Sequence, residues 1–395
     1  MRIVVDGGTW TNDRGYGRFT REILTAAAAL PSAHRFSLVI DSSAPPELPL
    51  PFPAVRVTLG APPGLAAAAD GRRSVADLWR MSRALSAQPG DCVFFPSVYT
   101  FVPLLDRRPV VVCIHDAIAE RFPAMIFATA RARWFWTLKA RAARWQAARI
   151  VTVSEHARQA IAEQYGVPAG DIRVVSEAPS AAFHAGAATA AARDALMRLG
   201  LAPDVRFLLY VGGIAPHKNL VALVDAVAAL QRSSRFTDVR LVIVGDYAGD
   251  VFYSSYPQVK ARIDGAGTGG AVFAGRLDDE VVAGLMRLAQ ALVLPSLDEG
   301  FGLPAIEAAA CGAAVLVTRH SAMPEVLGDA AAYFDPREEG ALAASLEHLL
   351  ADEALRARLG SLAAGRAKAW TWAAAGRRLL DVFDELAEPR AGGRG

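Results

Sequence analysis

Short apolar runs alternate with longer amphipathic stretches along nearly the whole chain. The short runs are rich in Val, Ile and Leu, which is typical of strands buried on both faces of a sheet. The longer stretches are rich in Ala and Leu, which is typical of helices that cover such a sheet. We therefore predict parallel α/β sheets, with strands at residues 3–6, 36–40, 55–59, 92–95, 110–114, 151–154, 207–211, 239–244, 271–274, 292–295 and 314–318.

The alternation forms two series of about 180 residues each, which predicts two doubly wound, Rossmann-like domains that face each other across a cleft. We assign residues 1–184 to the first domain and 185–369 to the second. The linker is expected within residues 178–204, which are rich in Ala, Gly and Pro around one short helix-like piece. Residues 370–395 hold a final amphipathic helix and a tail. Ligands of open α/β sheets bind beyond the carboxyl ends of strands, so chemistry is expected there.

Composition narrows the class of protein. The 395 residues are 53% hydrophobic and 21% charged, which supports large cores and excludes a mostly disordered chain. We expect no spanning helix, signal peptide, disulfide framework or zinc site, because apolar runs are short and the three cysteines lie far apart. The chain is thus expected to be soluble and cytoplasmic, and its net charge of +2 indicates no nucleic-acid partner.

The most informative segment, residues 295–307, follows an expected strand. Its glycines let a ligand approach the backbone, and Pro304 suits the first turn of a helix. A helix that begins near Gly302 would point its free N–H groups at an anion or a hydroxyl group. The spacing of Glu299 and Glu307 lets one carboxylate address a sugar ring and the other a neighbouring ribose. For either glutamate alone, a solvated surface carboxylate is the alternative.

A second segment, residues 210–219, again reads as strand, glycine loop and helix. Lys218 stands near the expected helix start, where a cation opposes the helix dipole. That placement makes sense if a diphosphate is held by both the lysine and the helix. The alternative is an ordinary surface lysine.

Two further candidates lie in the first half of the chain. His115 directly follows an expected strand and is either functional or a satisfied structural histidine. Gly15 and Gly17 begin a dinucleotide-type turn, but Thr20 replaces the third glycine, which disfavours a nicotinamide dehydrogenase. A loop whose backbone approaches phosphate or sugar remains a reasonable interpretation.

Residues 131–149 contain six basic residues and no acidic one, interleaved with aromatic residues. A basic helix with aromatic side chains can rest on an anionic membrane surface. The equally weighted alternative is a core helix whose arginines extend their charged ends into water.

These motifs resemble a known family. The residues that carry the resemblance are Val211-Gly212-Gly213, Lys218-Asn219, Glu299-Gly300-Phe301-Gly302-Leu303-Pro304 and Glu307, with Ile114-His115-Asp116, Val153-Ser154-Glu155 and Arg14-Gly15-Tyr16-Gly17-Arg18. The first four resemble the signature of the family-4 retaining glycosyltransferases of the GT-B fold, and the next two resemble its acceptor-domain motifs. The last resembles the bacterial polysaccharide mannosyltransferase branch.

The resemblance implies a role for each matching residue. Lys218 would neutralise the donor diphosphate, Glu307 would bind the ribose hydroxyl groups, and Glu299 would hold the donor sugar. The other implied donor contacts are the backbone of Phe301, Gly302 and Leu303, the loop at Gly15 and Gly17, the loop glycine Gly213, and Arg276 and Leu277 beside the nucleobase. His115 would touch the sugar from the N-terminal domain, onto which the helix from Trp370 would cross back.

One departure stands out. Many relatives carry a second phosphate-binding arginine near Gly213 or at the position of His217, and neither arginine is present here. Arg276 or Arg18 are candidates to replace it.

The resemblance implies a retaining hexosyltransferase that needs no metal or cofactor beyond its donor. The reaction we expect is transfer of mannose from GDP-mannose to a growing or lipid-linked surface polysaccharide. Its partners would be the nucleotide sugar and a glycan acceptor, with peripheral contact to the inner membrane surface as a separate hypothesis. The alternatives are a UDP- or dTDP-sugar donor such as UDP-glucose, or a non-catalytic nucleotide-sugar-binding scaffold.

Overall fold

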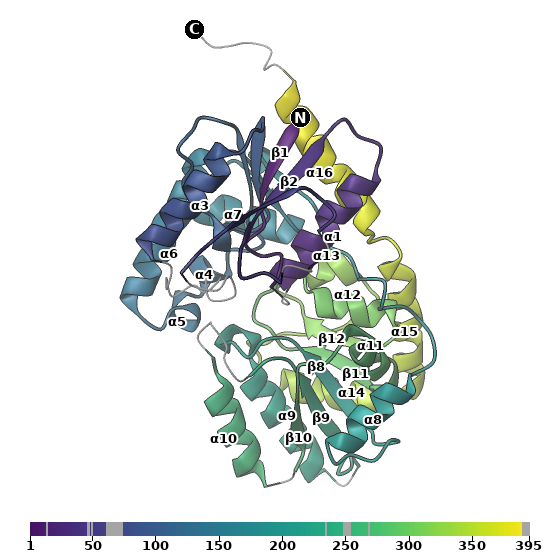
Figure 1. Ribbon diagram of the computed structural model, residues 1–395. Coiled ribbons are helices and arrows are strands. Elements are labelled where there is room, and N and C mark those ends of the chain that lie inside the picture. The colour runs from purple at the N-terminus through teal and green to yellow at the C-terminus, as the bar shows by residue number, and fades with distance from the viewer. Residues whose placement is uncertain are drawn as a thin grey trace. The chain divides into compact units, whose positions relative to one another are not determined.

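The computed structural model describes residues 1–12, 15–45, 48, 50–60, 74–233, 235–247, 254–267 and 269–388. These residues form two compact units (Figure 1). Unit 1 comprises Met1–Pro123, Phe127–Glu177 and the C-terminal segment from Thr371, and unit 2 comprises Ala124–Ile126 and Ala178–Trp370. The main chain thus passes from unit 1 to unit 2 after Glu177, whereas the sequence analysis placed that boundary after residue 184.

Unit 1 is built on a parallel seven-stranded sheet in the order β3-β2-β1-β4-β5-β6-β7. Strand β1 pairs in parallel with β2 and β4, so that Ile3 lies opposite Phe36 on one side and Cys92 on the other. The strands are β1 (Arg2–Asp6), β2 (Arg35–Asp41), β3 (Ala54–Val57), β4 (Cys92–Phe95), β5 (Val110–Cys113), β6 (Ala147–Thr152) and β7 (Ile172–Val174).

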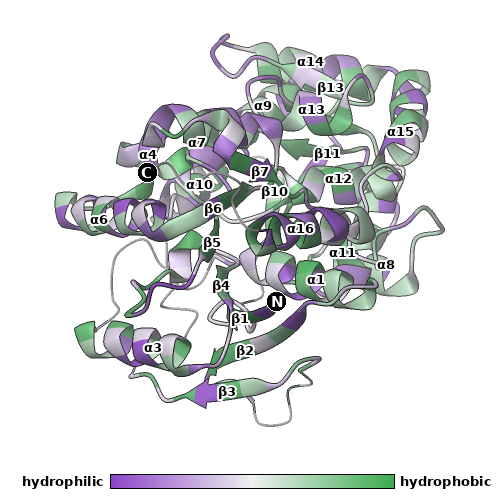
Figure 2. Cartoon of the chain, turned by 90° about the horizontal axis from the view of Figure 1, so that it is seen from above, coloured by the Kyte–Doolittle hydropathy of each residue, from purple (hydrophilic) through white to green (hydrophobic). Residues whose placement is uncertain are grey.

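Helices cover both faces of this sheet. Figure 2 shows α1 (Gly15–Ala29) and α16 (Trp372–Ala387) on one face, and α3 (Val75–Ala87) and α6 (Ala130–Gln146) on the other. Helix α16 packs along α1 at short range, because a Cβ atom at Gly376 would lie only 2.8 Å from the backbone nitrogen of Ala27. The remaining elements of unit 1 are η1 (Val98–Thr100), α4 (Ile118–Arg121), α7 (Glu155–Tyr165) and η2 (Ala169–Asp171). The short helix α5 (Pro123–Ile126) belongs to unit 2 except for its first residue.

Unit 2 has a parallel six-stranded sheet in the order β10-β9-β8-β11-β12-β13. The strands are β8 (Phe207–Val211), β9 (Arg240–Val244), β10 (Ala271–Gly275), β11 (Ala291–Leu294), β12 (Val315–Thr318) and β13 (Ala332–Phe334). The helices are α8 (Ala190–Arg198), η3 (Pro216–Lys218), α9 (Leu220–Arg232), α10 (Tyr256–Ala266), α11 (Asp279–Leu288), α12 (Leu303–Ala310), α13 (Met323–Leu327), α14 (Ala341–Ala351) and α15 (Glu353–Ala367).

The structure confirms the predicted fold class of two doubly wound parallel sheets and corrects some details. Strand β6 begins at Ala147 and stops at Thr152, because Ser154 instead caps α7 by accepting a hydrogen bond from the Ala157 nitrogen at 3.0 Å. Strand β7 was not predicted. The helix-like piece in the expected linker is the regular helix α8, which packs on α11.

Candidate active site

The two most informative motifs follow neighbouring strands of unit 2. Strands β8 and β11 lie side by side in the middle of the sheet, where the strand order reverses direction. Ligands of open α/β sheets bind at such a switch point, beyond the carboxyl ends of the strands. Lys218 comes after β8 and Glu299 comes after β11, so the topology brings both loops to this edge.

The loop after β8 is held by close backbone packing. A Cβ atom at Gly245 would lie 2.0 Å from the carbonyl oxygen of Gly212, so only glycine allows the loops after β8 and β9 to approach this closely. The carbonyl oxygen of Ile214 accepts hydrogen bonds from the backbone nitrogen of Ser255 at 2.7 Å and from its hydroxyl group at 3.0 Å. These contacts fix the path of the chain into the short helix η3, which ends at Lys218.

Asn219, between η3 and α9, has a φ angle of 57° and is the only non-glycine residue with positive φ in the described part of the chain. Asparagine tolerates this left-handed conformation better than most residues. Such conformations concentrate at ligand sites, where the surrounding structure holds them in place. The loop therefore ends at Lys218 and Asn219 in a sharp turn, which the left-handed conformation of Asn219 produces.

The loop after β11 leads into α12 through Gly302. This residue has a φ angle of 82°, and a Cβ atom there would lie 2.2 Å from the Cε atom of Met323. The preceding Phe301 is buried, and its ring meets that of Trp370 edge-on at a centroid distance of 5.2 Å. Pro304 occupies the first turn of α12, as the sequence predicts.

Lys218 and Glu299 touch each other. The Lys218 ammonium group donates to the Glu299 Oε1 atom at 2.7 Å, and their side chains are 22% and 13% exposed. The hydroxyl group of Ser296 donates to the same oxygen at 2.6 Å. The two loops are also joined through their backbones, since the nitrogen of Leu297 donates to the carbonyl oxygen of His217 at 2.8 Å. A partly buried ion pair thus links two residues that the sequence analysis assigned to different parts of the donor.

Sequence reasoning missed Ser296, although it lies in the motif itself, three residues before Glu299. It also underrated His217, which is 8% exposed and therefore lies beneath the loop surface. Burial, together with the positive charge of Lys218, holds the pKa of His217 well below its ordinary value. Within the described residues, its Nδ1 atom has no hydrogen-bond partner. His217 therefore adds no second cation beside Lys218 at neutral pH.

The other predicted donor residues of unit 2 occupy several places. Glu307 is in the second turn of α12 and is only 3% exposed, and Leu303 at the start of that helix is also buried. Gly213 is exposed, and its carbonyl oxygen accepts a hydrogen bond from the Tyr210 hydroxyl group at 2.6 Å. Arg276 is exposed and Leu277 half-buried, both directly after β10.

His115 lies in unit 1, directly after β5, and is 6% exposed. Its ring packs edge-on against Tyr16 and Phe19, at centroid distances of 5.0 and 4.8 Å. The Cys113 sulfur lies 3.8 Å from both ring nitrogens. Burial lowers the pKa of His115 to about 3, so the imidazole is neutral at physiological pH.

Gly15 and Gly17 belong to the first turn of α1 in unit 1 rather than to the loop before it. Gly17 is required by packing, because a Cβ atom there would lie 1.7 Å from the carbonyl oxygen of Asn12. Arg14, which was part of the motif, lies outside the described residues.

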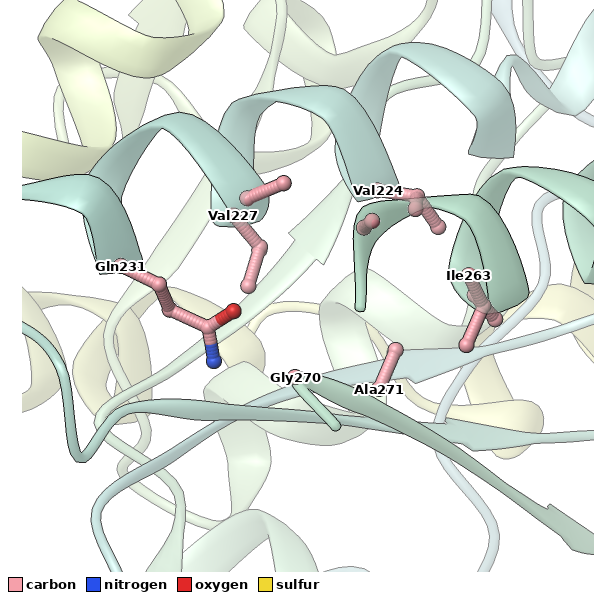
Figure 3. A pocket seen from close by; sticks show the side chains of 8 residues that line it. Val224, Val227, Gln231, Ile263, Gly270 and Ala271 are labelled. Atoms are coloured by element: carbon pink, nitrogen blue, oxygen red, sulfur yellow. The ribbon is translucent and has the colours of Figure 1, made fainter. Parts of the chain in front are cut away.

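The described residues contain no group of three or more His, Cys, Asp or Glu side chains placed to hold a metal ion. A small apolar cavity of ≈ 10 Å³ lies between α9, α10 and β10, with the Gln231 side chain directed toward Gly270 (Figure 3). Its volume is far below the several hundred Å³ of a ligand pocket. None of the predicted donor residues lines this cavity.

The fold and the site together define a class of protein. Two doubly wound parallel sheets in tandem are the GT-B fold of glycosyltransferases, and glycosyltransferase structures superpose on nearly the whole chain. The model of "Glycosyltransferase Family 4" matches residues 14–178, and the model of "Glycosyl transferases group 1" matches residues 195–366. The chain belongs to the glycosyltransferase family that these two models describe.

Characterised relatives share part of the chain. It is 29% identical to the serotype-specific mannosyltransferase WbdA of Escherichia coli over 60% of this chain and 29% of that protein. It is 30% identical to the O-antigen chain mannosyltransferase B of Escherichia coli over 56% of this chain and 57% of that protein. A D-inositol 3-phosphate glycosyltransferase of Kineococcus radiotolerans is 31% identical over 62% of this chain and 59% of that protein. The matches thus span from under a third to just over half of these relatives.

Solved structures show the same fold over nearly the whole chain. Sucrose-phosphate synthase from Thermosynechococcus elongatus superposes with a TM-score of 0.76 at 19% identity, covering 98% of this chain and 99% of that one. WaaG, a glycosyltransferase of lipopolysaccharide biosynthesis, superposes with a TM-score of 0.73 at 17% identity, covering 97% and 99%.

No helix among the described residues has the length and apolar character needed to cross a bilayer.

Proposed function

We propose that this glycosyltransferase is a retaining hexosyltransferase that transfers mannose from GDP-mannose to a growing or lipid-linked surface polysaccharide. The observation that carries the proposal is the contact of Lys218 with Glu299 at the switch point of the unit 2 sheet. A sugar diphosphate needs a cation for its phosphates and a hydrogen-bond acceptor for its sugar hydroxyl groups. Lys218 would supply the first and Glu299 the second.

The proposed chemistry uses these groups as follows. Breaking the bond between the anomeric carbon and the phosphate oxygen builds negative charge on the leaving diphosphate, which the Lys218 ammonium group stabilises. Glu299 accepts hydrogen bonds from the sugar and holds the ring in a reactive geometry. The departing phosphate oxygen takes the proton of the acceptor hydroxyl group on the same face of the sugar. The glycosidic bond forms on that face, so the anomeric configuration is retained without a protein base or a metal ion.

The ion pair suggests how donor binding is coupled to the reaction. Glu299 neutralises Lys218, and the Ser296 hydroxyl group donates to the carboxylate. An arriving diphosphate competes for the lysine, and the released carboxylate oxygen becomes available to a sugar hydroxyl group. Binding of the phosphates and positioning of the sugar are thereby coupled through one contact.

The choice of mannose rests on the names of relatives. Two curated relatives are mannosyltransferases of Escherichia coli, and one is named for an O-antigen chain. We therefore place the reaction in surface polysaccharide assembly, at the cytoplasmic side of the membrane where a lipid-linked acceptor is anchored. His115, Gly15 and Gly17 as donor contacts, Glu307 at the ribose, and Arg276 and Leu277 at the base remain predictions from the resemblance.

The test is to incubate the purified protein with GDP-mannose, UDP-glucose, dTDP-glucose and their free nucleotides. We expect slow hydrolysis of GDP-mannose and a shift in melting temperature with GDP, since ligand at about 100 times its Kd adds about 2.7 kcal/mol of stability. NMR of the released sugar, recorded before it mutarotates, should show the α configuration of the donor. Loss of that configuration would contradict the retaining mechanism.

Other outcomes select the alternatives. Preference for UDP or dTDP and their sugars would replace mannose as the donor sugar. Nucleotide-sugar binding with neither hydrolysis nor transfer would identify a non-catalytic scaffold.

A further inference from the structure

Helix α6 exposes several large apolar side chains on the surface of unit 1. Trp134, Leu138 and Trp145 are 58%, 44% and 84% exposed. They are spaced four and seven residues apart, so they fall within about 40° of one another around a helix with 3.6 residues per turn. Two tryptophans and a leucine in one solvent-facing stripe have no role in the core of this unit and indicate a binding surface.

The opposite side of α6 is fixed to the body of unit 1. Trp136 is buried, and its ring nitrogen donates to the Glu120 carboxylate at 2.5 Å. Lys139 turns inward and donates to the carbonyl oxygen of Tyr99 at 3.1 Å. Gln146 bonds both backbone groups of Leu104, at 2.9 and 3.1 Å. These anchors hold the helix at one rotation, so its outer stripe stays exposed.

Positive charge flanks the stripe. Arg131, Arg133, Arg141 and Arg144 are all exposed on α6, and no acidic residue occurs between Glu120 and Glu155. Arg149 does not belong to this group, since it lies 3.5 Å from Glu385. The guanidinium group of Arg131 lies 5.5 Å from the centre of the Phe135 ring, which itself is 42% exposed. Four arginines therefore surround the aromatic stripe.

A second helix on the same face of the sheet has the same character (Figure 2). On α3, Val75 and Trp79 are 82% and 53% exposed and lie one helical turn apart. The guanidinium group of Arg83 lies 5.2 Å from the centre of the Trp79 ring. The helices on the other face, α1 and α16, expose no large apolar side chain among their described residues.

We propose that the surface formed by Trp134, Leu138 and Trp145 with the arginines of α6 docks on an anionic lipid bilayer, with α3 as an auxiliary contact. Tryptophan rings settle at the level of the lipid headgroups, and exposed arginines bind lipid phosphates. A second copy of the chain fits this surface poorly, because a two-fold contact would place the arginines of both copies against each other. The proposal goes beyond the transfer reaction and does not depend on it.

The test measures flotation of the full chain with vesicles of phosphatidylcholine alone and with 30% phosphatidylglycerol. We expect flotation only with the anionic vesicles, and its weakening in 1 M salt, where the screening length falls to about 3 Å. Arg141→Gln with Arg144→Gln should lower the partition coefficient by roughly 10- to 30-fold. Trp134→Ser with Trp145→Ser should lower it by roughly tenfold or more.

Matched controls come from other surfaces. Arg377 and Arg378 are exposed on α16, on the opposite face of the same sheet, so their change to glutamine should leave flotation unchanged. Met197 and Leu362 are 52% and 43% exposed in unit 2, and their change to serine controls for lost apolar surface. The tryptophan fluorescence of the wild type should also be quenched by lipids brominated on their acyl chains.

Three results would overturn the proposal. One is equal flotation of the wild type and both α6 variants. Another is equal weakening by the α16 variants. The third is a dimer, detected by light scattering, that dissociates when Trp134 and Trp145 are changed to serine. The stripe would then serve self-association. None of these measurements requires transferase activity, so a failure of this proposal can be distinguished from a failure of the proposed function.

Discussion

Each unit gathers side chains beyond the carboxyl ends of its central strands, but the two groups differ in charge. In unit 2, Lys218 and Glu299 form an ion pair that water partly reaches. In unit 1, Tyr16, Tyr99 and His115 form a packed aromatic group, in which the Tyr16 and Tyr99 rings lie 4.7 Å apart. The same kind of fold thus supports a charged site in one unit and a neutral one in the other.

Burial explains the difference. It raises the pKa of the Tyr16 and Tyr99 hydroxyl groups well above the ordinary value and lowers that of His115, so all three are neutral near pH 7. Lys218 and Glu299 instead form an ion pair at 2.7 Å. Under the proposed function, Lys218 of unit 2 would meet the diphosphate, and the neutral side chains of unit 1 would meet sugar hydroxyl groups.

The largest expected effect follows from removing the cation of unit 2. Lys218→Ala should lower kcat/KM by 10²–10³, about 2.7–4 kcal/mol of transition-state stabilisation, and mostly through kcat. Lys260→Ala is the matched control, because Lys260 pairs with Asp264 on the exposed side of α10. Unchanged turnover of the true donor by Lys218→Ala would show that the lysine is not a phosphate ligand.

Removing the predicted ribose contact, Glu307, should change KM more than kcat. Glu307→Ala should lower kcat/KM by roughly 10², about 2.7 kcal/mol, and mostly through KM, because the ribose lies away from the reacting bond. Since Glu307 is buried, Glu307→Gln serves as the isosteric variant that keeps the packing. If both variants fold with unchanged melting temperature and keep the wild-type KM, the ribose assignment is wrong.

Close backbone packing near both groups is tested by adding one methyl group to a glycine. Gly245→Ala in unit 2 and Gly17→Ala in unit 1 place a Cβ atom 2.0 and 1.7 Å from a backbone oxygen, so each should cost about 2 kcal/mol or more in urea unfolding. Gly312→Ala is the control for Gly245→Ala, because both positions have a positive φ angle, 77° and 154°, while a Cβ atom at Gly312 meets nothing within 4 Å. A loss at Gly245 no larger than that at Gly312 would attribute the effect to backbone strain, and an unchanged stability of Gly17→Ala would contradict the packing argument in unit 1.

The smallest effect concerns pH. Because the pKa of His115 falls to about 3 in the folded protein, the unfolded chain binds the extra proton below about pH 6.5, and stability decreases as the pH falls from there. At pH 5.5 the loss from this residue should be about 1.4 kcal/mol in urea unfolding relative to pH 8. His115→Gln should remove that part of the decrease, whereas His184→Gln, at an exposed position, should not. An unchanged pH dependence in His115→Gln would mean that the histidine is solvated.

Much of the fold can be predicted from the sequence, because apolar runs and glycine positions are strong signals within short segments. Buried parallel strands such as β8 and β12 are continuous apolar runs, and the left-handed turn at Gly302 needs a glycine. Strand β7 was not predicted because its three residues are too few to show a strand pattern. The first half of β6 was not predicted because Ala147, Ala148 and Arg149 have little intrinsic strand preference. Their conformation comes from pairing with β5.

The sequence alone determined that Lys218, Glu299 and Glu307 follow glycine-containing loops at strand ends, because those loops need particular residue types at particular spacings. Only the tertiary structure decided that Lys218 meets Glu299 across 81 residues, that His115 is sealed among aromatic rings, and that Trp134 and Trp145 face water. The reason is that strand order and helix rotation are set by the packing of the whole unit, which no short segment encodes.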